Sequence, residues 1–436
     1  MTGLPPGPRG LLGPLARFAR DPVGAHQAFR ERWGDPFTLR LPGMRMVVTG
    51  DAATIRRVLS LPAEAFTVLD IGSEVMGEYA LIRLDGPAHA AARRQVAPLV
   101  MNPLRGDNGR IIQEIARRTF AETARRSVRM IDLAKALTLE VILRSVLGPI
   151  GQEELHRFAG AYAALQSRAS FLLHFVPALQ WDLGPWSPWG RIRRARAAVD
   201  RIIADAIARA AASGDEPLGP IAREASEASD PAVGTEALRH QVFTLLSAGH
   251  ASTAQALAWA TWHVFSDRAV LARLRGEVDG TDEPGRLVRL DYLDAVCREV
   301  LRLHPIGPVI GRKLALPLEI SGWTLAPGTV VGLSVGLAHT DPQAFPDAGR
   351  FQPERFLSGD RTPQDRAIPF GGGVRHCLGA NLGLAEMKLA LAELVRDWDV
   401  RLGDAARPAH RLIDAVAGPA SGVPLQMEPR QRRPGQ

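Results

Sequence analysis

The sequence predicts a mainly α-helical protein with a small β part. Of its 436 residues, 46% are hydrophobic and 23% are charged, which is ordinary globular composition. From His89 onward most of the chain shows helical spacing of apolar residues, and short runs bounded by Gly and Pro are few. There is no internal repeat and no clean linker. We therefore expect a single domain over residues 1–436.

The N-terminal elements follow in order. A Pro/Gly-rich lead fills residues 1–20, and a helical pattern then reaches about Trp33. Two apolar runs, 36–41 and 44–49, predict a β-hairpin because a Pro-Gly pair joins them. Asp51 is placed to cap the helix that follows.

The rest of the chain is predominantly helical. Residues 66–82 are mixed and predict a surface loop, and 211–231 is rich in Ser, Gly, Glu and Pro and predicts a loop or hinge. Short strands are expected at 308–337, an irregular Pro-rich segment at 340–369 and a disordered tail at 429–436. The expected helices are roughly 88–101, 108–127, 132–147, 152–170, 188–212, 267–278 and 291–303, with a last long helix from about Leu378.

One stretch is long enough to span a bilayer. From Gln241 to Ser266 there is no Asp, Glu, Lys or Arg. Its several Gln, Thr, Ser and His side chains are too many to face lipid, so it predicts the buried central helix of a large domain. The N-terminus has no signal-peptide pattern. We expect a soluble, cytoplasmic protein without a membrane anchor.

Charge and cysteine content exclude several classes. The net charge is +7, but arginines such as Arg117 and Arg125 alternate with glutamates as on solvated helix faces. This argues against nucleic-acid binding and leaves a basic docking surface for an acidic protein partner. Two cysteines exclude a disulfide framework and a four-thiolate cluster.

The strongest local signal is F-G-G-G-V-R-H-C-L-G at 370–379. A glycine-rich turn delivers Cys377 to the start of a helix, where backbone N–H groups and the helix dipole favour a thiolate. Glycines also let a flat macrocycle lie close to the backbone, and N–H groups aimed at the sulfur tune the potential of a bound metal. The segment resembles the heme-ligand loop of the cytochrome P-450 family, F-x-x-G-x-R-x-C-x-G, at every fixed position.

The resemblance implies the cytochrome P-450 fold, with heme b (iron protoporphyrin IX) between the central uncharged helix and the cysteine loop. Cys377 would be the iron ligand. His89 and Arg93, at i,i+4, look like a propionate-binding pair, and arginine suits carboxylates through charge-assisted hydrogen bonds. The cofactor-binding residues implied are His89, Arg93, Arg312, Phe370, Gly371, Arg375, Cys377, Gly379 and Gly383.

Two further motifs lie in the order of the family. Glu299 and Arg302 stand at i,i+3 and resemble its structural ion pair, with Arg355 as the third member. We expect this network to hold the core around the heme. The other cysteine, Cys297, is expected to be a small core residue.

The central helix carries A-G-H-A-S-T at 248–253, where the family has A-G-x-Asp/Glu-Thr across the oxygen-binding face. Gly249 would permit a local distortion that makes room for dioxygen. The acid position is Ala251 and the alcohol position is Ser252, so the usual proton-supplying pair is incomplete. The implied catalytic residues are Ser252, Ala248, Gly249 and Thr253. An open alternative is that Ser252 and Thr253 are ordinary small helix residues.

The resemblance implies a bacterial heme-thiolate monooxygenase that inserts one oxygen atom from O2 into a medium-sized apolar substrate in natural-product metabolism. Electrons would come from a ferredoxin or flavodoxin with its reductase, because the chain has no room for a flavin domain. We expect a monomer. The substrate walls expected from the resemblance are 66–82, 170–179, 243–247, 306–310 and 417–423, with Trp181, Trp186, Trp189, Pro185 and Pro188 stapling a lid.

Two alternatives remain open. A heme-thiolate peroxygenase or rearrangement enzyme would explain Ala251, because it need not manage the proton relay of dioxygen activation. A heme sensor without enzymatic activity would need a closed distal pocket.

Overall fold

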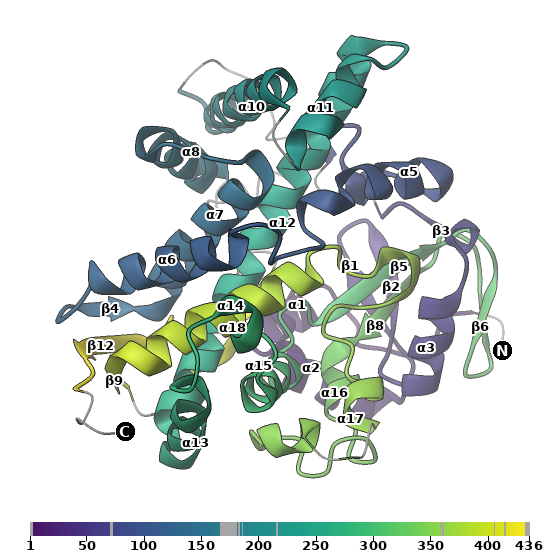
Figure 1. The fold of residues 1–436 in the computed structure, drawn as a ribbon. Helices are drawn as coiled ribbons and strands as arrows, with labels where there is room; N and C mark the ends of the chain where they lie inside the picture. The colour runs from purple at the N-terminus through teal and green to yellow at the C-terminus, as the bar shows by residue number, and fades with distance from the viewer. Residues whose placement is uncertain are drawn as a thin grey trace. The chain divides into compact units, whose positions relative to one another are not determined.

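The computed structural model describes residues 3–69, 73–165, 181, 184, 186–214, 217–357, 359, 362–404, 406–413 and 416–431. The chain forms two compact units. Figure 1 labels their helices and strands. The first comprises 1–67, 103–138 and 251–436, and the second comprises 68–102 and 139–250. The single-domain expectation remains a prediction.

The first unit contains a five-stranded sheet in the order β1-β2-β8-β5-β3. The predicted hairpin is confirmed, since β1 and β2 pair antiparallel with Phe37 opposite Val48. β2 then pairs parallel with β8, and β8 pairs antiparallel with β5. The strands are β1 (Phe37–Leu41), β2 (Met44–Thr49), β3 (Phe66–Thr67), β5 (Val309–Leu314) and β8 (Val330–Ser334).

Smaller β elements lie in the same unit. β12 is the central strand between β4 and β9, and β6 pairs with β7 and β10 with β11. The sequence patterns did not predict β4 or the C-terminal strands. They are β4 (Ser127–Arg129), β6 (Leu318–Ile320), β7 (Trp323–Leu325), β9 (Trp398–Leu402), β10 (His410–Ile413), β11 (Val416–Pro419) and β12 (Pro424–Pro429).

The first unit also contains helices, some of which pack against its sheets. Asp51 caps α3 as predicted, with its carboxylate accepting the N–H of Thr54 at 2.7 Å. Val58 and Leu59 of α3 pack into a core with Val331 and Leu333 of β8. The helices are α1 (Leu12–Arg20), α2 (Pro22–Trp33), α3 (Ala52–Ser60), α6 (Asn108–Ala121), α13 (Arg268–Val278), α14 (Pro284–Leu287), α15 (Asp291–Leu303), α16 (Val335–His339), α17 (Thr362–Arg366) and α18 (Ala380–Asp397).

The described part of the second unit consists of helices. Its α11 lies inside the stretch predicted as a loop or hinge, because Leu218, Ile221 and Ala225 form an apolar face that is buried. The helices are α4 (Ser73–Met76), α5 (Gly86–Val96), α8 (Gln152–Leu165), α10 (Pro188–Ser213) and α11 (Leu218–Ser226).

Two helices contribute to both units. α7 (Met130–Leu147) starts in the first unit, and α12 (Pro231–Ser266) starts in the second. α12 contains the whole uncharged stretch but begins ten residues before it, at a proline that follows Asp230. Within the described part of the chain, no helix is long and apolar enough to cross a membrane. The tail predicted at 429–436 lies outside the described residues from 432 onward.

Candidate functional site

The loop before α18 presents a cysteine at the surface of its unit. Cys377 is exposed and lies three residues before the first residue of α18. Its backbone N–H donates to the carbonyl of Phe370 at 3.0 Å, so the loop closes on itself. The N–H of Ala380 then donates to the Cys377 carbonyl at 3.4 Å. The thiol therefore lies near the positive end of an 18-residue helix, where the thiolate is favoured.

The glycines of this loop are required by its conformation and by close packing. Gly371 and Gly373 have φ angles of +68° and +66°, a region that L residues with side chains rarely adopt. A Cβ on Gly373 would lie 1.9 Å from the carbonyl oxygen of Leu59, at the end of α3. The loop therefore rests directly on the backbone of α3.

Gly379 has a different environment. A Cβ there would meet no atom within 4 Å, and its φ of −88° is open to any residue. Neither conformation nor packing in this structure demands glycine at that position. A flat macrocycle beside Cys377 would demand it, because glycine keeps the backbone approachable.

Two arginines come together in the same unit. Arg312 lies on β5 and is half-buried, and one of its N–H groups donates to the carbonyl of Gly311 at 2.9 Å. Burial, with a further contribution from the charge of Arg375, lowers the pKa of Arg312 to about 10. Paired guanidinium groups in a partly buried place suit a ligand with two carboxylates.

The donor set fits heme. The exposed thiol of Cys377 at the helix start suits iron ligation. Gly379, with no atom near its Cβ position, leaves room for a flat ring, and the two neighbouring arginines suit two propionates. All these groups belong to the first unit.

Glu299 and Arg302 are completely buried at the centre of an ion network, and Arg355 at its edge is half-buried. The carboxylate of Glu299 accepts two bonds from Arg302, at 2.7 and 2.8 Å, and one from Arg355 at 3.0 Å. The backbone N–H of Gln352 also donates to it at 3.0 Å. The guanidinium of Arg302 also donates hydrogen bonds to the backbone carbonyls of His339, Ala348 and Arg350. The network thus fixes the segment around residues 346–355 against α15.

The pattern analysis did not identify His339, which connects this network to the cysteine loop. Its Nδ1 lies 3.0 Å from the carbonyl oxygen of Arg302, and its Nε2 accepts the N–H of Ile368 at 2.8 Å. Because Nε2 accepts, the ring is neutral with its proton on Nδ1. Burial lowers the pKa of His339 to about 3, which agrees with this assignment. No motif spacing marks this residue, because the bond depends on two segments distant in sequence.

The part of α12 in the first unit carries the alcohol side chains. Ala251 and Ser252 are half-buried, whereas Thr253 is buried. A Cβ on Gly383 of α18 would lie 3.3 Å from the Thr253 hydroxyl oxygen. Thr253 therefore faces α18, and Ser252, about 100° further round the helix, faces another direction.

In the part of α12 that belongs to the second unit, glycine at position 249 is explained by helix packing. A Cβ on Gly249 would lie 2.9 Å from side-chain carbons of Ile142 on α7, so glycine permits close helix packing. α12 is one continuous α-helix from Pro231 to Ser266, and the local distortion expected at Gly249 stays a prediction. Ala248 is exposed, and His250 is buried edge-on to Tyr162 with ring centroids 5.3 Å apart.

The other expected site residues of the second unit lie on α5. His89 is buried and Arg93 is half-buried, one turn apart. Trp186 and Trp181 are 90% and 68% exposed, so they do not staple a lid to the body, and of these three tryptophans Trp189 alone is buried. Pro185 and the expected wall 170–179 lie outside the described residues.

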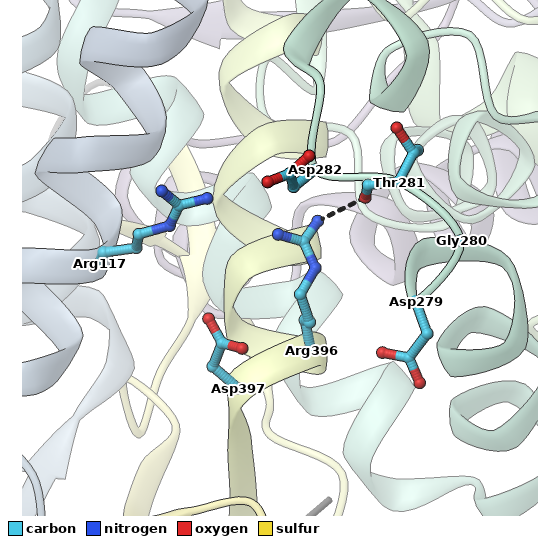
Figure 2. Close-up of a pocket in the computed structure, with 7 residues that line it drawn as sticks. All are labelled: Arg117, Asp279, Gly280, Thr281, Asp282, Arg396 and Asp397. Atoms are coloured by element: carbon cyan, nitrogen blue, oxygen red, sulfur yellow. Dashed lines mark hydrogen bonds between the residues drawn. The ribbon is translucent and has the colours of Figure 1, made fainter. Parts of the chain in front are cut away.

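A separate polar cavity of about 460 Å³ lies in the first unit, at the C-terminal end of α18 (Figure 2). The two arginines that line it already form ion pairs with the buried carboxylate of Glu393, which accepts hydrogen bonds from Arg117 at 2.7 Å and from Arg396 at 3.2 Å. Gln113 of α6 donates to the same carboxylate at 2.7 Å. This second glutamate network anchors α18 to α6. The residues lining the cavity are Arg117, Asp279, Gly280, Thr281, Asp282, Arg396 and Asp397.

Comparison with known proteins agrees with this geometry. The family model described as cytochrome P-450 matches residues 4–420. A Mycobacterium tuberculosis protein provisionally named cytochrome P-450 135A1 is 30% identical over 462 residues, covering 100% of this chain and 97% of that protein. A Mycobacterium bovis protein provisionally named cytochrome P-450 135B1 is 30% identical over 460 residues, covering 98% and 91%. The solved structure described as retinoic acid bound cyanobacterial CYP120A1 has a TM-score of 0.82 at 22% identity, covering 98% of this chain and 99% of that one.

Proposed function

Because the chain belongs to the cytochrome P-450 family of heme-dependent monooxygenases, we propose that it inserts one oxygen atom from O2 into a medium-sized apolar substrate. The observation that carries this proposal is Cys377, exposed at the start of α18 on a loop whose glycines are fixed by conformation and packing. The cofactor of the family is heme. When bound, it supplies the activation of dioxygen, and thiolate ligation favours O–O cleavage.

The proposed heme-binding residues each have a distinct role. Cys377 would ligate the iron, and the N–H groups at the start of α18 would stabilise its thiolate. Arg312 and Arg375 would bind propionates, since a carboxylate would offset both the burial and the Arg375 charge that lower the pKa of Arg312. His89 and Arg93 are proposed as further propionate partners on the resemblance of their motif. Phe370, Gly371, Gly379 and Gly383 would line the ring.

The network of Glu299, Arg302 and Arg355 would hold the cysteine loop in place. His339 extends it to Ile368, whose carbonyl accepts the N–H of Gly371 at 3.0 Å. Hydrogen bonds of this kind would limit the movement of the Cys377 ligand when the charge of the bound metal changes.

The overall reaction consumes O2, the substrate RH, two electrons and two protons, and yields ROH and water. We propose a ferredoxin or flavodoxin with its reductase as the electron source, and a cytoplasmic monomer as the working form. Ser252 would hold a proton at its hydroxyl. Ala248 and Gly249 would form the small-residue surface beside it.

The substrate class rests on the expected apolar walls. Phe243 and Leu245 of α12 are buried, and Ile306 accepts the N–H of Ala417 at 2.8 Å, which joins two of the predicted wall segments. A related fold binds retinoic acid, a medium-sized and largely apolar molecule. We propose a substrate of similar size and polarity from bacterial natural-product metabolism.

Ala251 favours a second candidate, a peroxygenase or rearrangement enzyme. Two assays separate the candidates. The purified heme protein is first screened for apolar compounds that shift its Soret band, and turnover of each hit is then measured with NAD(P)H plus redox partners or with hydrogen peroxide. Product with NAD(P)H and partners supports the monooxygenase. Product with peroxide alone, or rearranged product without any oxidant, overturns it.

A further inference from the structure

A cavity of about 410 Å³ lies along α10, and all the residues that line it belong to the second unit. One side is apolar and buried, because Val75 of α4 and Trp189 and Ile192 of α10 are at most 7% exposed. The other side is charged, with two arginines and one aspartate on the same helix. These charged residues are Arg193, Arg196 and Asp200. A cavity of this size and composition suits a molecule with an apolar body and an ionic group.

Arg196 is the buried cation of this cavity. Its side chain is 11% exposed, and its Nε and Nη2 donate to the carboxylate of Asp200 at 3.1 and 2.9 Å. Its Nη1 donates to the backbone carbonyl of Val75. Among the described residues, these bonds account for three of the five N–H groups of the guanidinium. The other two can donate to a ligand in the cavity.

The carboxylate of Asp200 is shared between two arginines. Arg239 of α12 also approaches it, with 3.5 Å between Nη1 and Oδ2. Arg239 contacts Glu236 as well, but that carboxylate is half-exposed, so water screens its charge. Burial lowers the pKa of Arg196, although the hydrogen bond and charge of Asp200 act in the opposite direction. Asp200 thus compensates the charge of Arg196 only in part, and a second carboxylate beside Arg196 would be stabilising.

The same arginine contacts a segment expected to form the substrate wall. Cζ of Arg196 lies over the ring of Phe243, 3.7 Å from its centroid. Phe243 is 1% exposed and is the first residue of the expected wall 243–247. The ring, the Asp200 carboxylate and the Val75 carbonyl together fix the guanidinium, so little order is lost when it binds an anion. An anchored cation therefore adjoins an apolar surface.

From these observations we propose that the substrate carries a carboxylate, which Arg196 binds in this cavity. The apolar body of the substrate would pack on Val75, Trp189 and Ile192. This inference rests on the proposed function and narrows its substrate class from apolar molecules to apolar carboxylic acids. Arg196 would decide which substrates bind and would take no part in the chemical step.

Binding is tested without turnover, on the heme-loaded protein. Dissociation constants are measured by equilibrium dialysis for three acids with different apolar bodies and for the methyl ester of each. The acids are dodecanoic acid, 1-naphthaleneacetic acid and abietic acid. We expect at least one acid to bind at least about tenfold more tightly than its ester, because the ester cannot form the charge-assisted hydrogen bonds. If no acid binds more tightly than its ester, the proposal is overturned.

Replacement of the arginine assigns the effect to this cavity. Arg196→Gln should weaken binding of the preferred acid at least about tenfold and leave binding of its ester unchanged. Arg201→Gln is the matched control, because Arg201 is an exposed arginine of the same helix and lies outside the cavity lining. It should leave both constants at the parent value. Equal weakening of acid and ester in Arg196→Gln would show that Arg196 only joins α10 to its neighbours, which contradicts the proposal.

A second variant covers the case in which Arg196→Gln does not fold. Because that change leaves Asp200 without its bidentate partner, Arg196→Gln is combined with Asp200→Asn, which removes both charges of the pair. We expect the double variant to bind acid and ester with equal affinity. A double variant that still prefers the acid would place the carboxylate elsewhere and refute the assignment to Arg196.

Turnover separates a substrate site from an effector site. With NAD(P)H and redox partners, the preferred acid should be oxidised, and Arg196→Gln should raise its KM at least about tenfold with kcat little changed. If the acid binds but only neutral compounds are oxidised, the cavity holds an effector and the substrate assignment is wrong. Failure of the proposed function is distinct: a parent that oxidises no compound with NAD(P)H refutes that function, whereas the preference for acid over ester is measured without turnover.

Discussion

The backbone N–H of Ile368 donates to Nε2 of His339 at 2.8 Å, and this bond joins the buried ion network to the residues just before the cysteine loop. The other ring nitrogen of His339 faces the carbonyl of Arg302, the centre of that network. One neutral imidazole thus connects the structural core to the loop that carries Cys377.

Replacement of His339 tests this connection. In His339→Phe, the Ile368 N–H and the Arg302 carbonyl lose their partner, and each unsatisfied buried group costs about 1–3 kcal/mol. We expect the free energy of unfolding in urea to fall by that order and heme to be lost faster. His156→Ala, at an exposed site on α8, is the control and should change neither quantity. Parent-like behaviour of His339→Phe would mean that the loop is held by other contacts.

Cysteine ligation is tested with the two cysteines of the chain. Reduced Cys377→His with carbon monoxide should lose the absorption band typical of thiolate-ligated heme. Cys297→Ser should keep it, because Cys297 is buried and its pKa is raised to about 12, so it remains a thiol. An unchanged spectrum in Cys377→Ala would refute the assignment of Cys377 as the iron ligand.

The propionate assignment predicts faster heme loss. Arg312→Gln removes a charge-assisted hydrogen bond worth roughly 1.5–3 kcal/mol, so transfer of heme to an acceptor protein should accelerate by about ten- to a hundredfold. Lys313→Gln is the matched control, because the next residue of β5 points to the opposite face of the sheet. Arg93→Gln against Arg94→Gln repeats the comparison on α5. Equal rates within either pair would reject that partner.

Ser252 has a separate test. Ser252→Ala should consume reducing equivalents with release of hydrogen peroxide and less product, since removal of a proton-transfer group typically lowers the rate about 10²–10⁴-fold. Ser252→Thr should be tolerated, because it keeps the hydroxyl. Full coupling in Ser252→Ala would assign the relay to the substrate or to a fixed water.

Acid should destabilise the protein through its buried histidines. Burial lowers the pKa of His263 and His339 to about 3, and that of His26 and His410 to about 4. These rings are neutral in the folded protein but bind protons in the unfolded chain below the ordinary histidine pKa of 6.5. Their contribution to stability is therefore present above pH 6.5 and is lost as pH falls toward the folded-state pKa values of about 3 to about 4. Unfolding free energy from urea titrations should fall by up to about 1.4 kcal/mol per pH unit per histidine. His26→Phe should flatten this slope, and an unchanged slope would exclude His26 as a contributor.

The sequence predicted most helices and the cysteine loop because their signals are local. The hairpin β1–β2 and the Asp51 cap depend on neighbours in the chain, and both are present. β12 was missed in part because one of its two partners, β4, lies almost 300 residues earlier in the chain. α11 was missed because its Ser, Gly and Pro content outweighed a short apolar face.

In the candidate site, too, the residues found from the sequence are those marked by local motifs. Motif order identified Glu299, Arg302 and Arg355, whose i,i+3 pairing and shared carboxylate the structure contains. His339 could not be found from spacing, because its role depends on a bond to a loop distant in sequence.

The contact between Gly373 and Leu59 also limits how this enzyme can be altered. A side chain at 373 would overlap a main-chain oxygen, which no substitution at position 59 can remove. The loop position and the end of α3 must therefore be inherited together, and no compensating second mutation is available to either. Libraries that seek new selectivity should therefore leave both positions untouched.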